Sequence, residues 1–406
     1  MKQAKNVPQL RFSGFDDDWE EKNFSEITYI SATKNKSNLP LESYSITNEN
    51  GFIPQDEQFE NGGTMKDADK RMYWIVSPKS FGYNPARINV GSIGYYDGKK
   101  DVIVSSLYEI FKMTENCDDA FFWQWFKSDN LQKQVLKLQE GGVRLYFYYD
   151  KLCMGEIKIP SKSEQQKIGS LLSNLDSLIQ AKTKKLESLK AVKKSLLQKC
   201  FPKAGAKVPE MRFAGFSGDW EKKDVKSFAI VKDGTHGTYP RVEKGIPLLS
   251  AKNVLDNELN ISNDESCISE QSYKEITANG FPKIGDVLLS CVGSIGRCCI
   301  LNTNEKVAFQ RSVIFIRTEE IDKSFLVTAF QSEYVQNQIS MLINASTIGG
   351  LYIGAVESLN IIFPSIAEQQ KIGEFFSKYD SLISAQQKEI DKLKNIKKSL
   401  LQKMFI

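Results

Sequence analysis

The sequence predicts an α+β fold made by tandem duplication, in which a strand-rich domain occurs twice and each copy is followed by a long helix. Three observations predict it. The two halves of the chain begin and end alike, each half closes with a charged periodic segment, and the middles contain short runs of β-type composition. At 406 residues, of which 41% are hydrophobic, the chain can bury substantial cores, which excludes global disorder.

The duplication is strongest at the ends of each half. Residues 7–24 read VPQLRFSGFDDDWEEKNF, and residues 208–225 read VPEMRFAGFSGDWEKKDV. Residues 160–201 match residues 364–405 at 25 of 42 positions. Similar ends with different middles indicate that the ends share one function, while the middles have two related but different functions.

The closing segments are expected to be long helices. Their apolar residues alternate at spacings of three and four, which is the pattern of a heptad seam. No proline interrupts either segment, and Pro202 follows the first. Each helix would have about 38 residues and a length of roughly 57 Å. The expected helix-pair interface consists of Ile168, Leu172, Leu175, Ile179, Leu186, Leu189, Leu196, Ile372, Phe376, Tyr379, Ile383, Ile390, Leu393 and Leu400.

Charge predicts that these two helices pair with each other in an antiparallel coiled coil. Parallel pairing would set the lysines near residue 193 beside those near residue 397. Antiparallel pairing sets lysines against Glu368, Glu374 and Asp380 instead, which is favourable although small for each exposed pair. The alternative is two separate amphipathic helices, each covering its own domain.

The middles read as mixed domains of short strands with polar loops. Gly, Asn and Asp clusters separate the apolar runs, and each middle ends with one helix-like piece, at 119–139 and 324–343. Exposed loops of this kind commonly carry recognition residues. The predicted division is a first domain at 1–158, a first helix at 159–203, a second domain at 204–362 and a second helix at 363–406.

Catalytic chemistry is not evident in the sequence. One histidine argues against most hydrolases, and no G-x-G-x-x-G or phosphate-binding G-x-x-x-x-G-K-[ST] loop occurs. The seven cysteines form no C-x-x-C pair, so we expect no metal site. The sequence therefore predicts a binding protein without a catalytic or metal centre.

The expected location is the cytoplasm. No run of about 18 apolar residues exists, which argues against a membrane span. The N-terminal segment MKQAKNVPQLRF lacks the apolar stretch of a signal peptide. Reduced cysteines are the simplest expectation in that compartment.

Several motifs together carry a family resemblance. The leading LRFSGF and MRFAGF segments, the helix openings PSxxEQQKIG and the helix endings KKSLLQKxF occur in both halves. The second middle contains DGTH at 233–236, SAKN at 250–253 and GDVLL with GSIGR within 285–297. The first middle contains YNPAR at 83–87 and VSSLY at 104–108. Over essentially its whole length, the chain resembles the specificity (S) subunit of type I restriction-modification enzymes.

The resemblance implies a division of labour among subunits. Each middle would be a target-recognition domain that reads one half of a split, asymmetric site in double-stranded DNA. The helix pair would set the spacer and bind two methyltransferase (M) subunits, which use S-adenosylmethionine. Two restriction (R) subunits, driven by ATP with Mg²⁺, would complete the nuclease. The S subunit itself would hold no cofactor and would not be an enzyme.

Candidate DNA contacts follow from the side chains that can reach base edges or phosphates. The alternative interpretation of each is a solvated or internally paired surface residue. A coiled-coil adaptor whose middles bind peptides is the alternative function, and a self-sufficient restriction enzyme is disfavoured by the missing cofactor motifs. The candidates are Lys34, Lys36, Asn84, Arg87, Arg144, Tyr146, Thr235, His236, Arg241, Lys252, Asn253, Arg297, Gln310 and Arg311.

The net charge of +4 hides an uneven distribution. Residues 181–207 contain nine lysines and one glutamate, and residues 388–403 contain six lysines and two acids. The rest of the chain is therefore net acidic. Because neutralisation of phosphates supplies most non-specific affinity, we expect weak DNA binding by the isolated chain.

Overall fold

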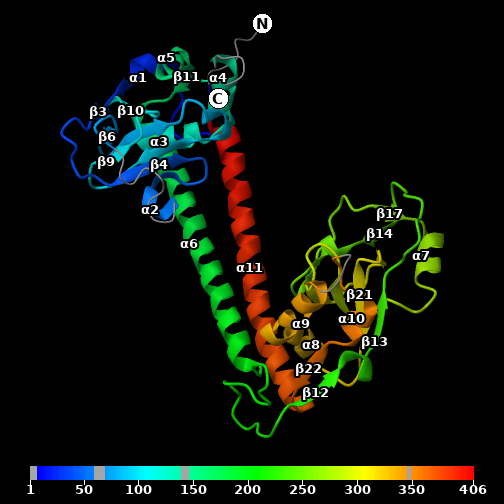
Figure 1. Cartoon of the computed structure of the whole chain (residues 1–406). Helices are drawn as coiled ribbons and strands as arrows, with labels where there is room; N and C mark the ends of the chain where they lie inside the picture. Colours follow the sequence, from blue (N-terminus) through cyan, green and yellow to red (C-terminus); the bar gives the residue numbers. More distant parts are fainter. Residues whose placement is uncertain (1–6, 59–68, 139–145, 345–348) are drawn as a thin grey trace. The chain divides into compact units, whose positions relative to one another are not determined.

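The computed structural model describes residues 7–58, 69–138, 146–344 and 349–406, and the chain divides into two compact units (Figure 1). The first unit comprises residues 1–182 and 389–406, and the second comprises residues 183–388. Each unit combines one strand-rich middle with sections of both long helices. The predicted α+β duplication is confirmed.

The first unit contains two sheets and a two-stranded ribbon. An antiparallel sheet has the order β2-β10-β7-β8, a mixed sheet has the order β3-β6-β9-β4-β5, and β1 pairs with β11. The strands are β1 (Glu20–Asn23), β2 (Thr28–Ile30), β3 (Thr33–Lys34), β4 (Ser43–Thr47), β5 (Gly51–Pro54), β6 (Trp74–Val76), β7 (Ser80–Tyr83), β8 (Ile93–Tyr96), β9 (Val102–Val104), β10 (Glu109–Met113) and β11 (Glu156–Ile159).

The second unit repeats part of this plan. Its sheet β13-β21-β18-β19 has the same antiparallel order, and the ribbon β12-β22 matches β1-β11. The remaining strands differ, because they form a three-stranded sheet β17-β14-β20 and a hairpin β15-β16. The strands are β12 (Glu221–Asp224), β13 (Ile230–Asp233), β14 (Ile246–Leu249), β15 (Val254–Leu255), β16 (Glu258–Leu259), β17 (Cys267–Ile268), β18 (Val287–Ser290), β19 (Cys298–Ile300), β20 (Ala308–Phe309), β21 (Val313–Arg317) and β22 (Asn360–Phe363).

Short helices cover these sheets. The first unit has α1 (Phe24–Ile27), α2 (Gln55–Gln58), η2 (Ile88–Val90), α3 (Asp119–Phe126), α4 (Asp129–Leu138) and α5 (Tyr149–Met154). The second unit has η3 (Val225–Ser227), η4 (Ala251–Asn253), α7 (Glu270–Ile276), α8 (Lys323–Gln331), α9 (Glu333–Asn344) and α10 (Ile353–Glu357).

The prediction of a single helix at the end of each middle is wrong, because the structure has two helices there. The break falls at Ser128 between α3 and α4, and at Ser332 between α8 and α9. Each serine hydroxyl donates to a carbonyl three residues earlier, at 2.6 Å, and accepts from a backbone amide of the next helix. A hydroxyl used in this way ends one helix and caps the next.

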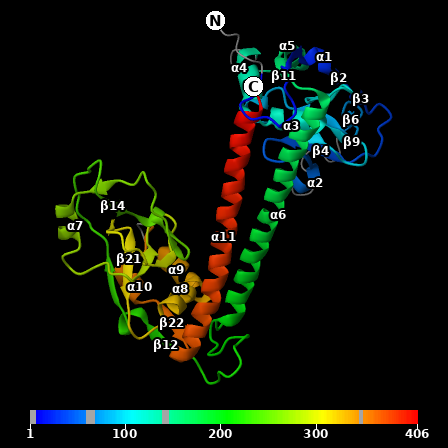
Figure 2. The ribbon, with the colours of Figure 1, turned by 180° about the vertical axis from the view of Figure 1, so that it is seen from behind.

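Both long helices form as predicted, and each is 39 residues long: α6 (Lys162–Cys200) and α11 (Ile366–Met404). Within the first unit, Asp176 pairs with Lys397 at 2.5 Å and Lys182 pairs with Glu389 at 2.7 Å. A higher number on α6 therefore meets a lower number on α11, so the helices run antiparallel. In the second unit Lys193 pairs with Asp380, in the same sense. Figures 1 and 2 show the two helices side by side from opposite directions.

The expected seam residues are divided between two environments. Ile168 and Leu172 lie in the core of the first unit, and Ile372 and Phe376 lie in the core of the second. Leu186 and Ile390 are also buried. Partly exposed seam residues are Leu175, Ile179, Leu189, Leu196, Tyr379, Ile383, Leu393 and Leu400. Each helix thus uses its N-terminal apolar turns to cover its own domain, as the alternative interpretation proposed, and also pairs with the other helix.

The C-terminal end of each helix packs on the domain of the other copy. Met404 and Phe405 belong to the core of the first unit, where Phe405 contacts Phe121 with ring centroids 5.2 Å apart. Phe201 belongs to the core of the second unit and stacks on Phe325. This exchange ties both copies together through buried aromatic surface.

The Asp176 ion pair predicts an acid-sensitive contribution to stability. Burial raises the pKa of Asp176, but hydrogen bonds from Lys397 and Gln124 and the charge of Lys127 outweigh burial, so the pKa lies below its ordinary value. Such a group stabilises the fold above its unfolded pKa of about 3.9, and this contribution disappears as the pH falls through the native pKa. We expect Asp176→Asn to be less stable than wild type near neutral pH, with a gap that narrows below about pH 4 in urea unfolding.

The equivalent residue of the second unit, Asp380, provides the control. Burial raises its pKa more than Lys193 lowers it. Acidification through that range should therefore stabilise wild type relative to Asp380→Asn. A stability gap for Asp176→Asn that is independent of pH would contradict the prediction.

Candidate nucleic-acid interface

Each domain is fixed to its own long helix by a buried ion pair. Arg11 binds the Glu164 carboxylate through two nitrogens, at 2.8 and 2.9 Å, and Arg212 binds Glu368 in the same way, at 2.7 Å for both contacts. The glutamates are almost fully buried at the start of α6 and α11. The arginine comes from the leading RF-x-GF segment and the glutamate from the EQQKIG opening. In each copy these two repeated motifs therefore form the ion pair between the domain and its helix.

The next glutamine of the opening holds the start of one domain helix, α3 in the first copy and α8 in the second. In the second copy, the Gln369 side chain accepts from Asp322 N at 2.9 Å and donates to Pro364 O at 2.9 Å. Asp322 in turn caps α8 by accepting from Phe325 N. Gln165 and Asp118 repeat the arrangement in the first copy. Both domains are therefore joined to their own long helices through the same kind of helix cap.

Four loops of the second unit are joined by hydrogen bonds, most of them between backbone groups. Thr235 N donates to Phe309 O, and Arg311 N donates to Thr235 O, which places the 233–237 loop against the 310–312 turn. Gln310 N donates to Leu249 O, Ala251 N donates to Ser312 Oγ, and Cys291 N donates to Ser312 O. The loops at 233–237, 250–253, 291–297 and 310–312 therefore form one cluster. It brings together Thr235, His236, Lys252, Asn253, Gln310 and Arg311, with Arg297 at the end of its loop.

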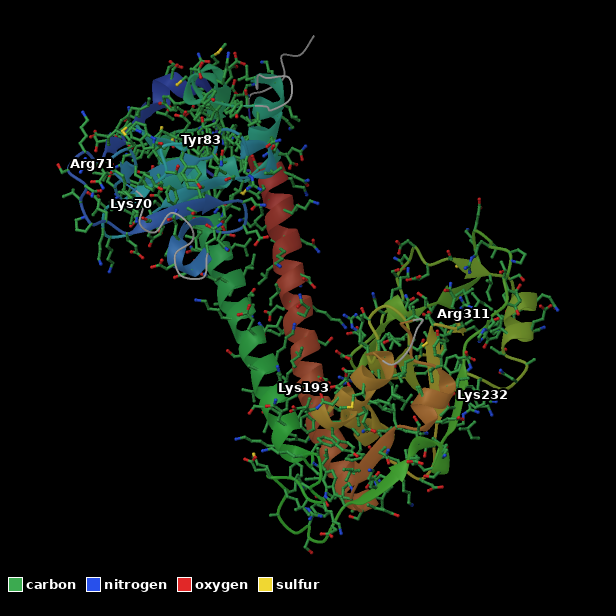
Figure 3. The ribbon with its side chains drawn as sticks, in the orientation of Figure 1. Lys70, Arg71, Tyr83, Lys193, Lys232 and Arg311 are labelled. Carbon is green, nitrogen blue, oxygen red and sulfur yellow. The ribbon has the colours of Figure 1, made fainter. Side chains whose placement is uncertain are left out.

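Exposed cations mark this loop cluster. The side chains of Arg297 and Arg311 in these loops, and of Arg241 outside them, are exposed and have no hydrogen-bond or ion-pair partner among the described residues. His236 is exposed and lies 2.7 Å from Asp233, between Nε2 and Oδ2. Figure 3 labels Arg311 and also Lys232, an exposed lysine on edge strand β13 that was not predicted from the sequence. Side chains alternate between the two faces of a strand, so a lysine between two inward-facing residues is expected to be exposed. This alternation is the sequence signal by which Lys232 could have been predicted.

Asn253 has a different environment from these cations. It is 1% exposed, and its side-chain amide accepts from Ser250 N and donates to Asn260 O and to the Glu265 carboxylate. The geometry favours a supporting role for Asn253 in the loop, and its contact with DNA stays a prediction. Arg241 lies one residue before Val242, which pairs with Cys267 near this loop.

In the first unit, two segments bring together part of the predicted set. Phe147 N donates to Pro85 O at 3.0 Å, which places Tyr146 beside the loop of Asn84 and Arg87. Asn84 Oδ1 accepts from Ala86 N and shapes this turn, whereas Arg87 is exposed. The Tyr146 ring stacks on Tyr148, with planes 3° apart. Arg144 lies outside the described residues.

Lys34 lies in β3, an edge strand of the mixed sheet of the first unit, and Lys36 follows this strand. The Lys34 ammonium donates to Met72 O at 2.9 Å and lies 3.3 Å from the centroid of the Trp74 ring, and burial lowers its pKa. Lys36 is exposed. Lys70 and Arg71 lie close to this edge, because Tyr73 N donates to Lys70 O and Asn35 N donates to Tyr73 O. Neither of these two residues, which Figure 3 labels, was predicted from the sequence.

Other functional centres are not evident in the part of the chain that the structure describes. No group of three or more His, Cys, Asp or Glu residues there could hold a metal ion. No helix in these ranges is long and apolar enough to cross a membrane. All seven cysteines are free, and burial raises the pKa of Cys291 to about 11 and that of Cys299 to about 12. A raised thiol pKa lowers the fraction of thiolate, so Cys291 and Cys299 do not indicate cysteine chemistry.

Two related domains with different loops, each fixed to one helix of an antiparallel pair, define a duplicated recognition protein. A family model described as "Type I restriction modification DNA specificity domain" matches the chain twice, over residues 16–191 and 218–395. The chain therefore belongs to the type I restriction-modification specificity family. As a specificity subunit it is not itself an enzyme.

Individual relatives agree with this assignment. The type I restriction enzyme MjaVIII specificity subunit of Methanocaldococcus jannaschii is 26% identical over 326 residues, which cover 77% of this chain and 75% of the relative. The putative MjaX specificity subunit of the same organism is 21% identical and covers 98% and 95% of the two chains. A crystal structure of the type I S subunit from M. genitalium has a TM-score of 0.65 at 15% identity, covering 98% of this chain and 99% of that one. This last likeness concerns the fold alone.

Proposed function

We propose that each strand-rich domain reads one half of a bipartite, asymmetric site in double-stranded DNA. The domain at 204–362 would do so through the second-unit loop cluster, and the domain at 1–158 through the loop of Asn84, Arg87 and Tyr146 together with the edge that carries Lys36. The observation that supports this most directly is the set of exposed, unpartnered arginines on hydrogen-bonded loops of the described ranges. Arginine in that setting can bind guanine edges or phosphates.

The difference between the two middles supports two different half-sites. The shared sheet and ribbon provide the same base in both copies, whereas the remaining strands and the loops differ. DNA has two-fold symmetry, so two related domains can meet half-sites on opposite strands. Because the side chains differ, the two half-sites should have different sequences.

The long helices would set the spacer between the half-sites and bind two M subunits. Their solvent-facing lysines are available for a protein partner, and charged residues on paired helices commonly select partners. The M subunits would use S-adenosylmethionine, and two R subunits with ATP and Mg²⁺ would add restriction. We expect the complex to act in the cytoplasm, where the chromosomal DNA is accessible.

Exchange of one recognition domain tests this proposal. Residues 20–158 would be replaced by the equivalent segment of another family member, and the chimaera co-expressed with its M subunit. We expect methylation mapping of the whole genome to show one changed half-site, with the other half-site and the spacer retained. A change in both half-sites, or a wild-type complex that methylates no split motif, would contradict the proposal.

A further inference from the structure

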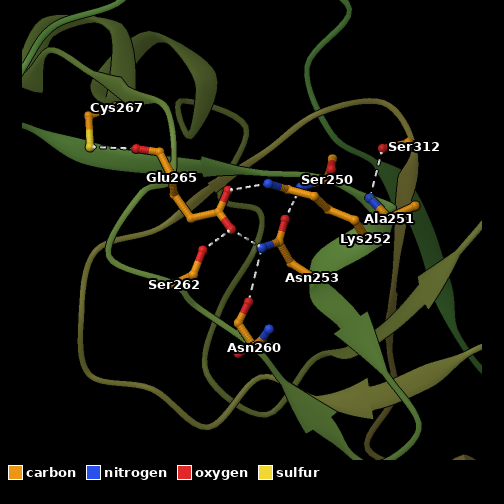
Figure 4. Close-up of polar contacts among 9 residues, drawn as sticks. All are labelled: Ser250, Ala251, Lys252, Asn253, Asn260, Ser262, Glu265, Cys267 and Ser312. Atoms are coloured by element: carbon orange, nitrogen blue, oxygen red, sulfur yellow. Dashed lines mark hydrogen bonds and ion pairs between the residues drawn. The ribbon is translucent and has the colours of Figure 1, made fainter. Parts of the chain in front are cut away.

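Lys252, one of the cations on the second-unit loop cluster, is held in place by a buried carboxylate. Its ammonium lies 3.0 Å from Glu265 Oε2. The lysine side chain is 68% exposed, whereas the glutamate side chain is 5% exposed. Figure 4 shows Lys252 reaching from its loop to this carboxylate. The pair therefore differs from an ordinary surface salt bridge, in which both groups are solvated.

The carboxylate is itself fixed by neighbouring groups. Glu265 Oε1 accepts from Asn253 Nδ2 at 2.6 Å and from Ser262 Oγ at 2.8 Å, as Figure 4 shows. Asn253 is held by the backbone of Ser250 and Asn260. Only Oε2 faces Lys252, so the network gives the lysine one defined partner.

The network also keeps Glu265 charged. Burial raises the pKa of Glu265, but hydrogen bonds from Lys252, Ser262 and Asn253 outweigh it, so the pKa lies below the ordinary value. A carboxylate this buried needs a counter-charge, and Lys252 provides it. An exposed lysine normally samples many rotamers, and ordering it costs free energy on binding. The contact with Glu265 already orders the Lys252 side chain before DNA binds, so less of this free-energy cost remains.

The position of this lysine relates it to the other candidate contacts. Ala251, its neighbour, donates to Ser312 Oγ, and Ser312 follows Arg311. The loop that carries Lys252 is thereby attached to the turn that carries the exposed Arg311. The lysine is thus held at the same loop cluster as the exposed arginines.

We propose that Glu265 is a positioning residue for base selection, which holds Lys252 in the orientation that discriminates among bases in one half-site. The proposal rests on the proposed function, since it assumes that the second unit reads DNA. It extends that function by dividing the cations of the cluster: Lys252 selects a base from a fixed position, whereas the exposed arginines adapt to the backbone or to base edges.

The test compares Glu265→Gln and Lys252→Met, each co-expressed with the M subunit. Glutamine keeps an acceptor for Asn253 and Ser262 but removes the charge that holds Lys252. We expect both variants to lose about tenfold or more discrimination at the same position or positions of one half-site, because one good base contact contributes that much. The double variant should resemble either single variant. The matched control is Glu270→Gln, which breaks the exposed Lys306–Glu270 pair of the same unit and should leave the motif unchanged.

The outcomes separate this inference from the proposed function. Wild type that methylates no split motif would contradict the proposed function itself. Wild type with a split motif, together with folded variants that keep the same motif, would overturn the role of Glu265 alone. Relaxation in both half-sites would also overturn it, because a positioning residue acts on its own domain only. If either single variant does not fold, the double variant Glu265→Gln with Lys252→Met decides the question, since it removes the buried charge together with its counter-charge.

Discussion

An Arg212→Met variant is expected to lose about 3 kcal/mol of unfolding free energy, because its partner Glu368 would remain buried without a counter-charge. Both carboxylate oxygens of Glu368 accept from Arg212 at 2.7 Å, and the Glu368 side chain is 1% exposed. The arginine also donates to Ser217 O and Gly218 O, which fixes the turn of the leading segment. Methionine keeps much of the packing of the side-chain stem but none of these hydrogen bonds.

Urea unfolding would measure the loss, and hydrogen exchange would locate it in the second unit. The control is Lys378→Met, which breaks the exposed pair with Glu374 on the same helix and should leave the unfolding midpoint unchanged. A double variant, Arg212→Met with Glu368→Met, removes the buried charge as well and should regain part of the lost stability. A loss below about 1 kcal/mol for the single variant would contradict the argument.

The parts of the fold that follow a period or a repeat could be predicted from the sequence. The long helices have a heptad pattern and no internal proline, so their existence and nearly all of their length were predictable. Their direction followed from charge, and the pairs of Asp176 with Lys397 and of Lys193 with Asp380 confirm it. These signals are local or regular, which is why a single sequence shows them.

The breaks and exchanges in the fold could not be predicted in the same way. Ser128 and Ser332 lie within apolar periodic runs, and their hydroxyls bond to the backbone only once the helices pack. Both long helices end in similar Lys-x-Phe sequences, so the sequence alone does not show that Phe201 packs in the second unit and Phe405 in the first.

Residue type indicated only part of the candidate site. Arg297 and Arg311 are exposed, as a DNA-contacting residue must be, whereas Asn253 has a suitable side chain that is buried and fully hydrogen bonded. The difference depends on Glu265, which is 12 residues away and has no sequence motif that marks it. Contacts between distant loops, such as that of Thr235 with Gln310, have no periodic signature.

Gly373→Ala is expected to destabilise the second unit by about 3 kcal/mol, because a methyl group has no room where α11 meets the start of α8. A Cβ atom at Gly373 would lie 2.7 Å from Phe325 N and 2.8 Å from Asp322 Oδ1. These are the two atoms of the cap that begins α8. The clash is therefore with backbone and with a helix cap, and neither can move away as the end of a flexible side chain could. Gly169 faces Phe121 N and Asp118 Oδ1 in the same way, so Gly169→Ala should destabilise the first unit similarly.

The matched control for this substitution is Gly354→Ala, since Gly354 also lies in a helix of the second unit and a Cβ atom there would have no described neighbour within 4 Å. There alanine should be neutral or stabilise the fold by up to about 1 kcal/mol, because it restricts the unfolded chain without a steric cost. Thermal unfolding of the three variants measures the contrast. If Gly373→Ala were as stable as Gly354→Ala, the close approach would not be what requires glycine in the EQQKIG opening. If it is less stable, this glycine is needed to seat each recognition domain on its helix, and its presence in both copies follows from the same contact.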